Sequence, residues 1–262
     1  PLRRRWTRRR GCHRVRRAGE GPVADRRRWL PDGRAETRSL DPTDVDDGVD
    51  AARRSEGHAV SANWFIGLPV DPGRWFAPLV RTAPGFLRIF HPDDIHITVA
   101  FLGSCGRDSA RQAWAHVQQQ VRTRSLGPLP VTLGTMEPMG NPKRPSALSV
   151  VLSRGAEPVA ELVGSLREGA WAAASARSDD RPPLPHITVA RPGRRASGAE
   201  RRRAIQWALE RPPVGAEMTL DRIALLTWAE DRRIRQFRTV EQTLLAPGPS
   251  SATPRRPQSE NA

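Results

Sequence analysis

Hydrophobic and polar residues follow two different spacings along the middle of the chain. Apolar runs at residues 63–68, 86–90 and 95–102 are short and bounded by Pro or Gly, which is typical of strands. Residues 108–124 instead repeat apolar positions at helical spacing. The repeating face consists of Ala110, Ala113, Trp114, Val117 and Val121. The pattern therefore predicts strands and amphipathic helices within one region.

Similar patterns predict the remaining elements. An acidic N-cap followed by proline at Asp71-Pro72 predicts the start of a helix, which Pro84-Gly85 ends. Residues 141–145 form a predicted turn. The other predicted helices are residues 159–176 and 199–210, and the other predicted strands are residues 129–136, residues 147–152, one beginning at His186, and a hairpin of residues 219–228 and 235–245. Mixed strands and helices over about residues 59–245 indicate an α+β domain.

One pentapeptide, His-Ile-Thr-Val-Ala, occurs twice, beginning at His96 and again at His186. The chance of a second copy at this composition is on the order of 10⁻⁴, so the repeat is a motif to be tested by its context. Side chains alternate in a strand, so His96 and Thr98 share one face while the Ile and Val between them point to a core. His186 and Thr188 share a face in the same way. The copies lie 90 residues apart, which predicts two equivalent halves that bring one motif each to a shared cleft.

Two histidines that face each other form a natural acid–base pair, because the imidazole titrates near neutral pH. The two Thr hydroxyls suit the non-bridging oxygens of a phosphoryl group, where negative charge accumulates. This chemistry requires no metal. His91 and Asp94 are the candidates for additional metal ligands, but a turn at Pro92 explains them equally well. Structural or solvated roles are expected for His13, His58, His91 and His116.

Charge and composition divide the chain. Residues 1–57 combine many Arg residues with scattered apolar residues and predict a disordered arm, and residues 247–262 predict a disordered tail. This leaves residues 58–246 as the domain. The net charge of +15 suits a polyanion such as nucleic acid, although an Arg-rich composition with the single Lys143 is also typical of GC-rich coding. Both explanations stay open.

The sequence also bears on location. Neither Cys12 nor Cys105 has metal-ligand spacing, and a disulfide framework is not expected, which favours a reducing compartment. No run approaches the roughly 18 apolar residues of a membrane span, and the start lacks the apolar segment of a secretory signal. We therefore expect a cytoplasmic protein, without membrane association.

The paired motif resembles that of the 2H phosphoesterases, which are named for two His-x-Thr/Ser-x-hydrophobic motifs. Within them the chain is most similar to the bacterial RNA 2′,3′-cyclic phosphodiesterases, also called 2′-5′ RNA ligases or LigT-like proteins. The resemblance covers about residues 59–245. It includes the Trp64–Pro69 strand, the first motif extended to Gly103, Pro185 and Arg191 around the second motif, and the closing strands at 225–228 and 237–245.

The resemblance implies a bilobal, pseudo-two-fold α+β fold, with two antiparallel-sheet lobes, outer helices and a central cleft. It implies metal-independent hydrolysis of an RNA or nucleoside 2′,3′-cyclic phosphate to a 2′-phosphate, with no cofactor and with a reversible 2′-5′ ligase capacity. His96 is then the acid on the 3′ oxygen and His186 the base on water. Thr98 and Thr188 hold the phosphate.

Three further residues are candidates for substrate contact. Arg191 matches the basic residue that often follows the second motif, Phe101 is expected on the His96 face, and Trp228 is a candidate base-stacking platform. Each also has an ordinary alternative, as a surface, core or sheet-capping residue. The chain departs from the family because it has no Tyr, and Trp228 and Phe237 stand near the place of the usual Tyr.

Two other functions remain open: a phosphodiesterase for a small cyclic nucleotide or an ADP-ribose cyclic phosphate, and a nucleotide- or RNA-binding module without turnover. The intact His and Thr of both motifs argue against the binding module. The expected partners are RNA with 2′,3′-cyclic phosphate ends or a small cyclic nucleotide, acted on by a monomer.

Overall fold

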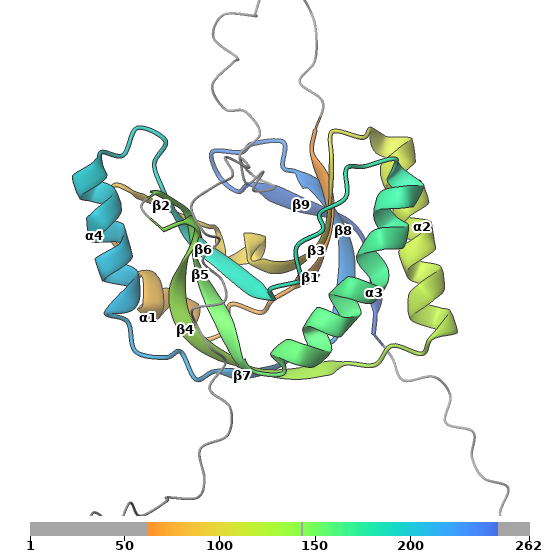
Figure 1. The fold of residues 1–262 in the computed structure, drawn as a ribbon, viewed down its shortest axis with the longest axis horizontal. Helices are drawn as coiled ribbons and strands as arrows, with labels where there is room; N and C mark the ends of the chain where they lie inside the picture. Colours follow the sequence, from red (N-terminus) through yellow and green to blue (C-terminus); the bar gives the residue numbers. More distant parts are fainter. Residues whose placement is uncertain (1–61, 143, 246–262) are drawn as a thin grey trace, which may run out of the picture. The chain divides into compact units, whose positions relative to one another are not determined.

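The computed structural model describes residues 62–245, residue 143 excepted (Figure 1). Its strands are β1 (Trp64–Pro69), β2 (Leu87–Ile89), β3 (His96–Gly103), β4 (Leu129–Asn141), β5 (Arg144–Arg154), β6 (His186–Pro192), β7 (Glu217–Leu220), β8 (Arg222–Trp228) and β9 (Phe237–Leu244). Its helices are α1 (Phe76–Val80), the 3-10 helix η2 (Pro92–Asp94), α2 (Arg107–Thr123), α3 (Ala156–Ala174) and α4 (Gly198–Leu209). The predicted arm and tail lie outside the described residues.

The strands form a single antiparallel sheet that curls into a half-barrel. Its order is β7-β4-β5-β6-β3-β1-β8-β9, and β2 also pairs with β6. The two motif strands, β6 and β3, therefore lie at the middle. We call β3, β1, β8 and β9 lobe one, and β6, β5, β4 and β7 lobe two. Counted outward from the middle the lobes match strand for strand, which confirms the predicted pseudo-two-fold α+β fold.

Each lobe has its own helices. α2 and α3 pack on each other and on strands β1 and β3 of lobe one, whereas α4 packs on β4, β5 and β6 of lobe two. α1 lies beside α4 (Figure 1), and Trp207 Nε1 of α4 donates to Thr82 Oγ1 just after α1. The buried residues of α2 are those that its helical spacing predicts, including Trp114 and Val117. The helices thus hold the two halves of the sheet in place.

The lobes are not the two halves of the sequence. Lobe one takes β1 and β3 from the first part of the domain and β8 and β9 from its end, whereas the strands of lobe two lie between them in the sequence. The prediction of one continuous strand over 219–228 is wrong: β7 ends at Leu220 and pairs with β4, whereas β8 begins at Arg222 and pairs with β1 and β9. Both strands bury side chains, so the apolar pattern continues across the break at Asp221.

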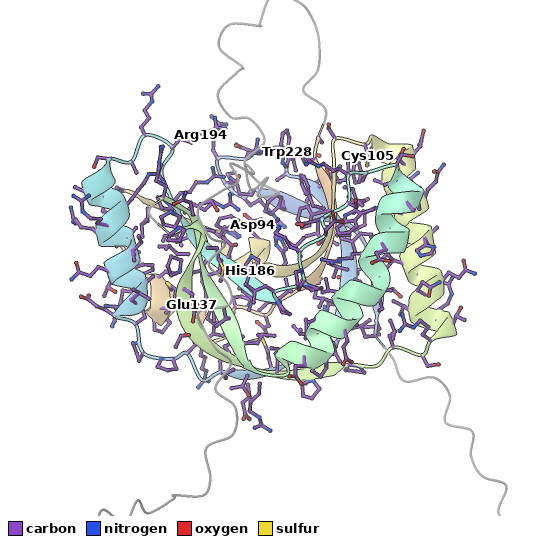
Figure 2. All side chains as sticks on the ribbon, viewed as in Figure 1. Asp94, Cys105, Glu137, His186, Arg194 and Trp228 are labelled. Atoms are coloured by element: carbon purple, nitrogen blue, oxygen red, sulfur yellow. The ribbon has the colours of Figure 1, made fainter. Side chains whose placement is uncertain are left out.

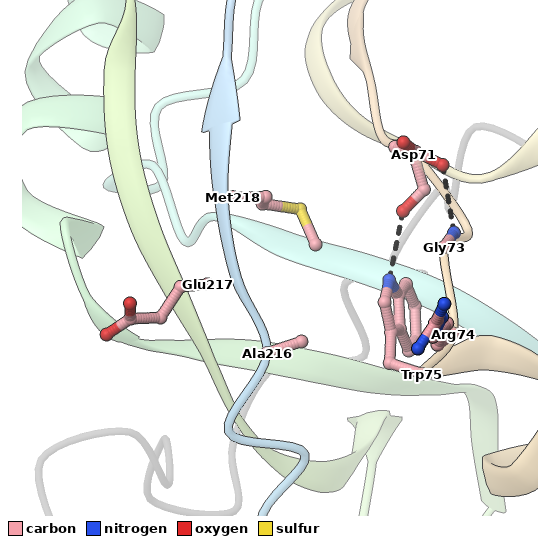
Figure 3. Close-up of a pocket in the computed structure, with 7 residues that line it drawn as sticks. All are labelled: Asp71, Gly73, Arg74, Trp75, Ala216, Glu217 and Met218. Atoms are coloured by element: carbon pink, nitrogen blue, oxygen red, sulfur yellow. Dashed lines mark hydrogen bonds between the residues drawn. The ribbon is translucent and has the colours of Figure 1, made fainter.

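The predicted helix start at Asp71-Pro72 is also wrong. Asp71 Oδ1 accepts a hydrogen bond from Gly73 N at 2.9 Å, and the Asp71 carbonyl accepts one from Trp75 Nε1 at 2.9 Å (Figure 3). Gly73 has φ +40°, a conformation that favours glycine. The Asp side chain therefore stabilises a turn, and α1 begins only at Phe76. A pocket between this turn and β7 contains no residue of either motif.

Candidate active site

The two motifs meet where the lobes join. Ile97 of β3 and Ile187 of β6 are opposite each other in antiparallel register, and both are buried. Side chains of paired residues point to the same side of a sheet, so the neighbouring motif residues lie together on the other face. This face, which carries His96, Thr98, His186 and Thr188, is called the motif face. The structure thus brings together all four residues that the repeat predicts.

Both motif strands contain the same β-bulge. In β3 the register shifts between Thr98 and Ala100, so that Val99 has no partner on β1. In β6 it shifts between Thr188 and Ala190, so that Val189 has no partner on β5. A bulge changes the alternation of side chains beyond it. Each motif consequently has the same burial pattern, in which the residue after Ala is again half-buried, like His and Thr.

The bulge returns Phe101 to the motif face, although strict alternation would place it on the opposite face. Phe101 pairs with Phe65, whose ring centroid lies 4.7 Å from that of His96. Trp228 lies on the same face, because it pairs with Phe237, whose ring lies 5.5 Å from His96. Phe101 thus lies on the motif face because of the bulge and not because of alternation, and its contact with a substrate stays a prediction. Phe65 and Phe237 are neighbours of the site that the repeat did not reveal.

Both catalytic candidates are held in the same tautomer. His96 Nδ1 lies 2.6 Å from the Asp94 carbonyl oxygen, and His186 Nδ1 lies 2.7 Å from the Leu184 carbonyl oxygen. A carbonyl only accepts, so Nδ1 donates in each ring and Nε2 is left for other partners. Figure 2 shows His186 and Asp94 near the middle of the view, between the two groups of helices. The backbone thus prepares both Nε2 atoms for proton transfer.

The surroundings of His96 favour a neutral ring. Burial is the main cause that lowers its pKa from 6.5 to about 4, against the hydrogen bond to Asp94, which raises it. The charges of His186 and Arg191 lower it further. Phe65 and Phe237 provide the apolar contacts on this side. In the ligand-free protein, His96 is therefore neutral at pH 7.

Asp94 fixes one of these aromatic neighbours. Its buried carboxylate accepts hydrogen bonds from the backbone N–H of Gln236 at 2.6 Å and of Phe237 at 3.0 Å. The Arg235 guanidinium lies 3.8 Å away. The Asp94 side chain thus holds the start of β9, and its carbonyl orients His96. The Asp94 carboxylate, which the sequence suggested as a candidate metal ligand, thus accepts hydrogen bonds from the backbone at the start of β9.

The turn interpretation of His91 is confirmed. His91 Nδ1 accepts a hydrogen bond from Asp93 N at the start of η2. Within residues 62–245, apart from 143, three or more His, Cys, Asp or Glu side chains nowhere come together as a metal site would require. His116 packs against α3 so closely that a Cβ added at Gly169 would clash with its Nε2, which supports a structural role. His13 and His58 lie outside the described residues.

The two motif Thr residues have different partners on the neighbouring strands. Ser149 of β5 is fully buried, pairs with Thr188, and places its Oγ 3.2 Å from Thr188 Oγ1. At the matching place in lobe one, Thr98 pairs with Gly67. A Cβ at Gly67 would lie 3.1 Å from the Ile97 oxygen and 3.3 Å from His96 Cδ2. No sequence pattern indicates Ser149 or Gly67, because strand pairing alone brings them to the motifs.

Arginine side chains add positive charge to this region. The Arg191 guanidinium lies 5.6 Å from the ring centroid of Phe90, and its charge acts on His96. The Arg232 guanidinium lies 4.1 Å from the ring centroid of Trp228. The hydroxyls and nearby guanidinium groups suit the binding of an anion, and the two imidazoles suit proton transfer to and from it.

Comparison with known proteins identifies the family. The model of the 2′-5′ RNA ligase superfamily matches residues 89–232, which include both motifs and more than half of the chain. The chain belongs to this superfamily. Its members act on RNA or nucleotide substrates, so the protein is an enzyme of phosphodiester chemistry, a phosphoesterase or a ligase. The resemblance inferred from the motifs is confirmed at the level of the superfamily.

Solved structures share the fold. TT0787 of Thermus thermophilus is 22% identical, with a TM-score of 0.54 over 70% of this chain and 97% of that one. E. coli LigT in complex with 3′-AMP is 17% identical, with a TM-score of 0.51 over 70% of this chain and 97% of that one. Curated protein sequences give no match. None of the helices within residues 62–245 is long and apolar enough to cross a membrane.

Proposed function

We propose that this protein hydrolyses the 2′,3′-cyclic phosphate of an RNA end or a nucleoside to a 2′-phosphate, with His96 and His186 as its acid and base. The main observation in support is that β3 and β6 pair at Ile97 and Ile187 and that both histidines are fixed through hydrogen bonds of their Nδ1 atoms. This arrangement leaves the Nε2 atoms of both rings available on one face of the sheet. It supports proton transfer at both ends of one reacting phosphorus centre.

In the proposed reaction, a water oxygen attacks the phosphorus while His186 Nε2 accepts the proton of that water. The bond from phosphorus to the 3′ oxygen breaks, and His96 Nε2 gives its proton to that oxygen. The 2′ ester bond stays intact. Thr98 and Thr188 donate hydrogen bonds to the non-bridging oxygens, and Arg191 adds positive charge. After the reaction His186 gives its extra proton to water and His96 takes up a proton again, so both histidines return to their starting states.

The acid role of His96 requires proton uptake on binding. Its pKa of about 4 keeps the ring neutral in the ligand-free protein, whereas an acid must carry a proton. An anionic phosphoryl group beside the ring favours the imidazolium and raises this pKa. Phosphate binding should therefore strengthen as the pH falls from 7 towards 5, with proton uptake measurable by calorimetry in buffers of different ionisation enthalpy.

The surroundings of the pair support a substrate class. E. coli LigT, which has this fold, has been solved with 3′-AMP and with ATP. Trp228 and Phe101 supply aromatic surface on the motif face of this chain, and aromatic rings stack on bases of any sequence. These observations support a nucleotide or RNA end as substrate. If the 5′-hydroxyl of a second RNA end replaces water as the nucleophile, the bond from phosphorus to the 3′ oxygen breaks in the same way and a 2′-5′ phosphodiester forms, which would be the ligase reaction.

Product analysis tests the proposal. The full-length protein is incubated with an oligonucleotide that ends in a 2′,3′-cyclic phosphate and, separately, with the cyclic mononucleotide, each with and without EDTA. We expect a 2′-phosphate product by ³¹P NMR and no loss of rate on chelation. A 3′-phosphate product, or no turnover of either substrate, would overturn the proposal. A strong preference for the mononucleotide would assign the site to a small cyclic nucleotide instead of RNA.

A further inference from the structure

We propose that Ser149 is a positioning residue that aims the Thr188 hydroxyl at a phosphoryl oxygen. The inference rests on the proposed function, because it takes Thr188 as a phosphate ligand. It concerns a residue outside both motifs, on the neighbouring strand β5.

Because Ser149 is buried, the hydrogen bond between its hydroxyl and Thr188 is significant. Its side chain is 0% exposed, and its Oγ lies 3.2 Å from Thr188 Oγ1. Thr188 is the partner of this hydroxyl within the described part of the chain. A buried hydroxyl without a partner is costly, so the contact is expected to persist when a ligand binds.

The direction of the bond follows from the ligand. A phosphoryl oxygen only accepts, so Thr188 must donate its hydroxyl proton to it. The Thr188 oxygen can then accept from Ser149, whose proton has no other acceptor among the described residues. The result is a chain from Ser149 to Thr188 to the anion. Successive hydrogen bonds polarise one another, so Thr188 becomes a stronger donor.

Among the described residues, lobe one has no matching pair of hydroxyls. Gly67 occupies the place that matches Ser149, and the Thr98 hydroxyl has no hydrogen-bond partner within the described residues. No neighbouring hydroxyl therefore orients Thr98, whereas Thr188 is oriented before the ligand arrives. The effect of removing the Ser149 hydroxyl should therefore depend on Thr188 and be independent of Thr98.

A double-mutant cycle in the full-length protein tests this dependence. Binding of inorganic phosphate and kcat/KM for a 2′,3′-cyclic mononucleotide are measured for Ser149→Ala, Thr188→Val and the double variant. We expect Ser149→Ala alone to weaken both about tenfold, as loss of one hydrogen bond to an anion-binding group predicts. In the Thr188→Val background it should change either by less than about twofold. Combined with Thr98→Val, its tenfold effect should remain.

Ser153→Ala is the matched control, because Ser153 lies on the same strand and donates to the Thr132 carbonyl at 3.2 Å. It should leave phosphate binding unchanged. Equal effects of Ser149→Ala with and without the Thr188 hydroxyl would overturn the proposal, as would absence of phosphate binding by the wild type. If the wild type binds phosphate but turns over no cyclic phosphate, the proposed reaction fails, and the phosphate cycle still decides the role of Ser149.

Discussion

The two motif strands share five residues and one bulge, yet their surroundings differ. In lobe one, His96 lies against Phe65 and Phe237, with Gly67 leaving room for its ring. In lobe two, the matching strand provides Ser149, which bonds to Thr188. Identical local sequence gives identical local geometry, while the adjacent strands give each copy different chemistry.

This difference suits an acid–base pair. Two histidines that share one reaction perform opposite tasks, and sites of this kind use unequal environments to separate them. A symmetric protein would have two equal imidazoles. Here the aromatic neighbours of His96 come from β1 and β9, whereas lobe two has no equivalent aromatic contact with His186 within the described residues. The pseudo-two-fold fold therefore holds an asymmetric site.

The largest expected effect comes from removing either Nε2. His96→Asn and His186→Asn keep a donor for the carbonyl at the Nδ1 position, so the fold should survive. Each should lower turnover of a 2′,3′-cyclic nucleotide by roughly 10²–10⁴-fold, the usual contribution of general acid–base catalysis. His116→Asn is the control and should retain the wild-type rate.

A change of leaving group then separates the two histidines. In 1,2-phenylene phosphate, a cyclic diester, the leaving oxygen is a phenolate and needs little protonation. His96→Asn should regain most of its activity on this substrate, and His186→Asn should not. Recovery of His186→Asn instead would exchange acid and base. A near-normal rate of either variant on the nucleotide would contradict the assignment of the pair.

The environment of His96 should also appear in the pH dependence of stability. Its pKa is about 4 in the folded protein against an ordinary 6.5, so between these values the unfolded chain binds a proton that the folded chain does not. Its contribution is fully present above pH 6.5 and is lost as the pH falls towards 4. The free energy of unfolding should fall by about 3 kcal/mol from this residue between pH 7 and pH 4.

Urea unfolding at several pH values measures this contribution. The fall in stability should be smaller by about 3 kcal/mol in His96→Asn, which does not titrate in this range. Thr98→Val, a neighbouring change without a titrating group, should keep the wild-type dependence. Parallel curves for wild type and His96→Asn would show that the apolar surroundings of lobe one do not affect this histidine.

The smallest effect concerns the space beside His96. In Gly67→Ala, the new methyl would lie 3.3 Å from His96 Cδ2 and 3.1 Å from a backbone oxygen, so the ring must move by a few tenths of an ångström. We expect a loss of kcat of roughly tenfold, because small displacements of a catalytic group reduce the rate. Gly85→Ala is the control, since nothing lies within 4 Å of its added Cβ. Equal rates for both variants would remove Gly67 from the site.

Elements with a regular pattern of apolar residues could be predicted from the sequence, and the others could not. Helix α2 and both motif strands follow from spacing and alternation, because their apolar faces are continuous and regular. The break between β7 and β8 at Asp221 could not be predicted, because buried apolar residues continue on both sides of it. The late start of α1 at Phe76 could not be predicted either, because the Asp71 side chain stabilises a turn where the pattern suggested a helix N-cap. Phe101 lies on the expected face, but it reaches that face through a bulge that no residue pattern marks.

The repeated pentapeptide was enough to predict the two histidines, the two threonines and two related lobes, because both copies stand in the sequence. The residues that surround them follow from the way the strands pair in three dimensions. Ser149, Gly67 and Phe237 come from strands far away along the chain, and strand pairing brings them to the motifs. Hydrogen bonding between strands is nonlocal, so the asymmetry of the site is a property of the sheet and of no single segment.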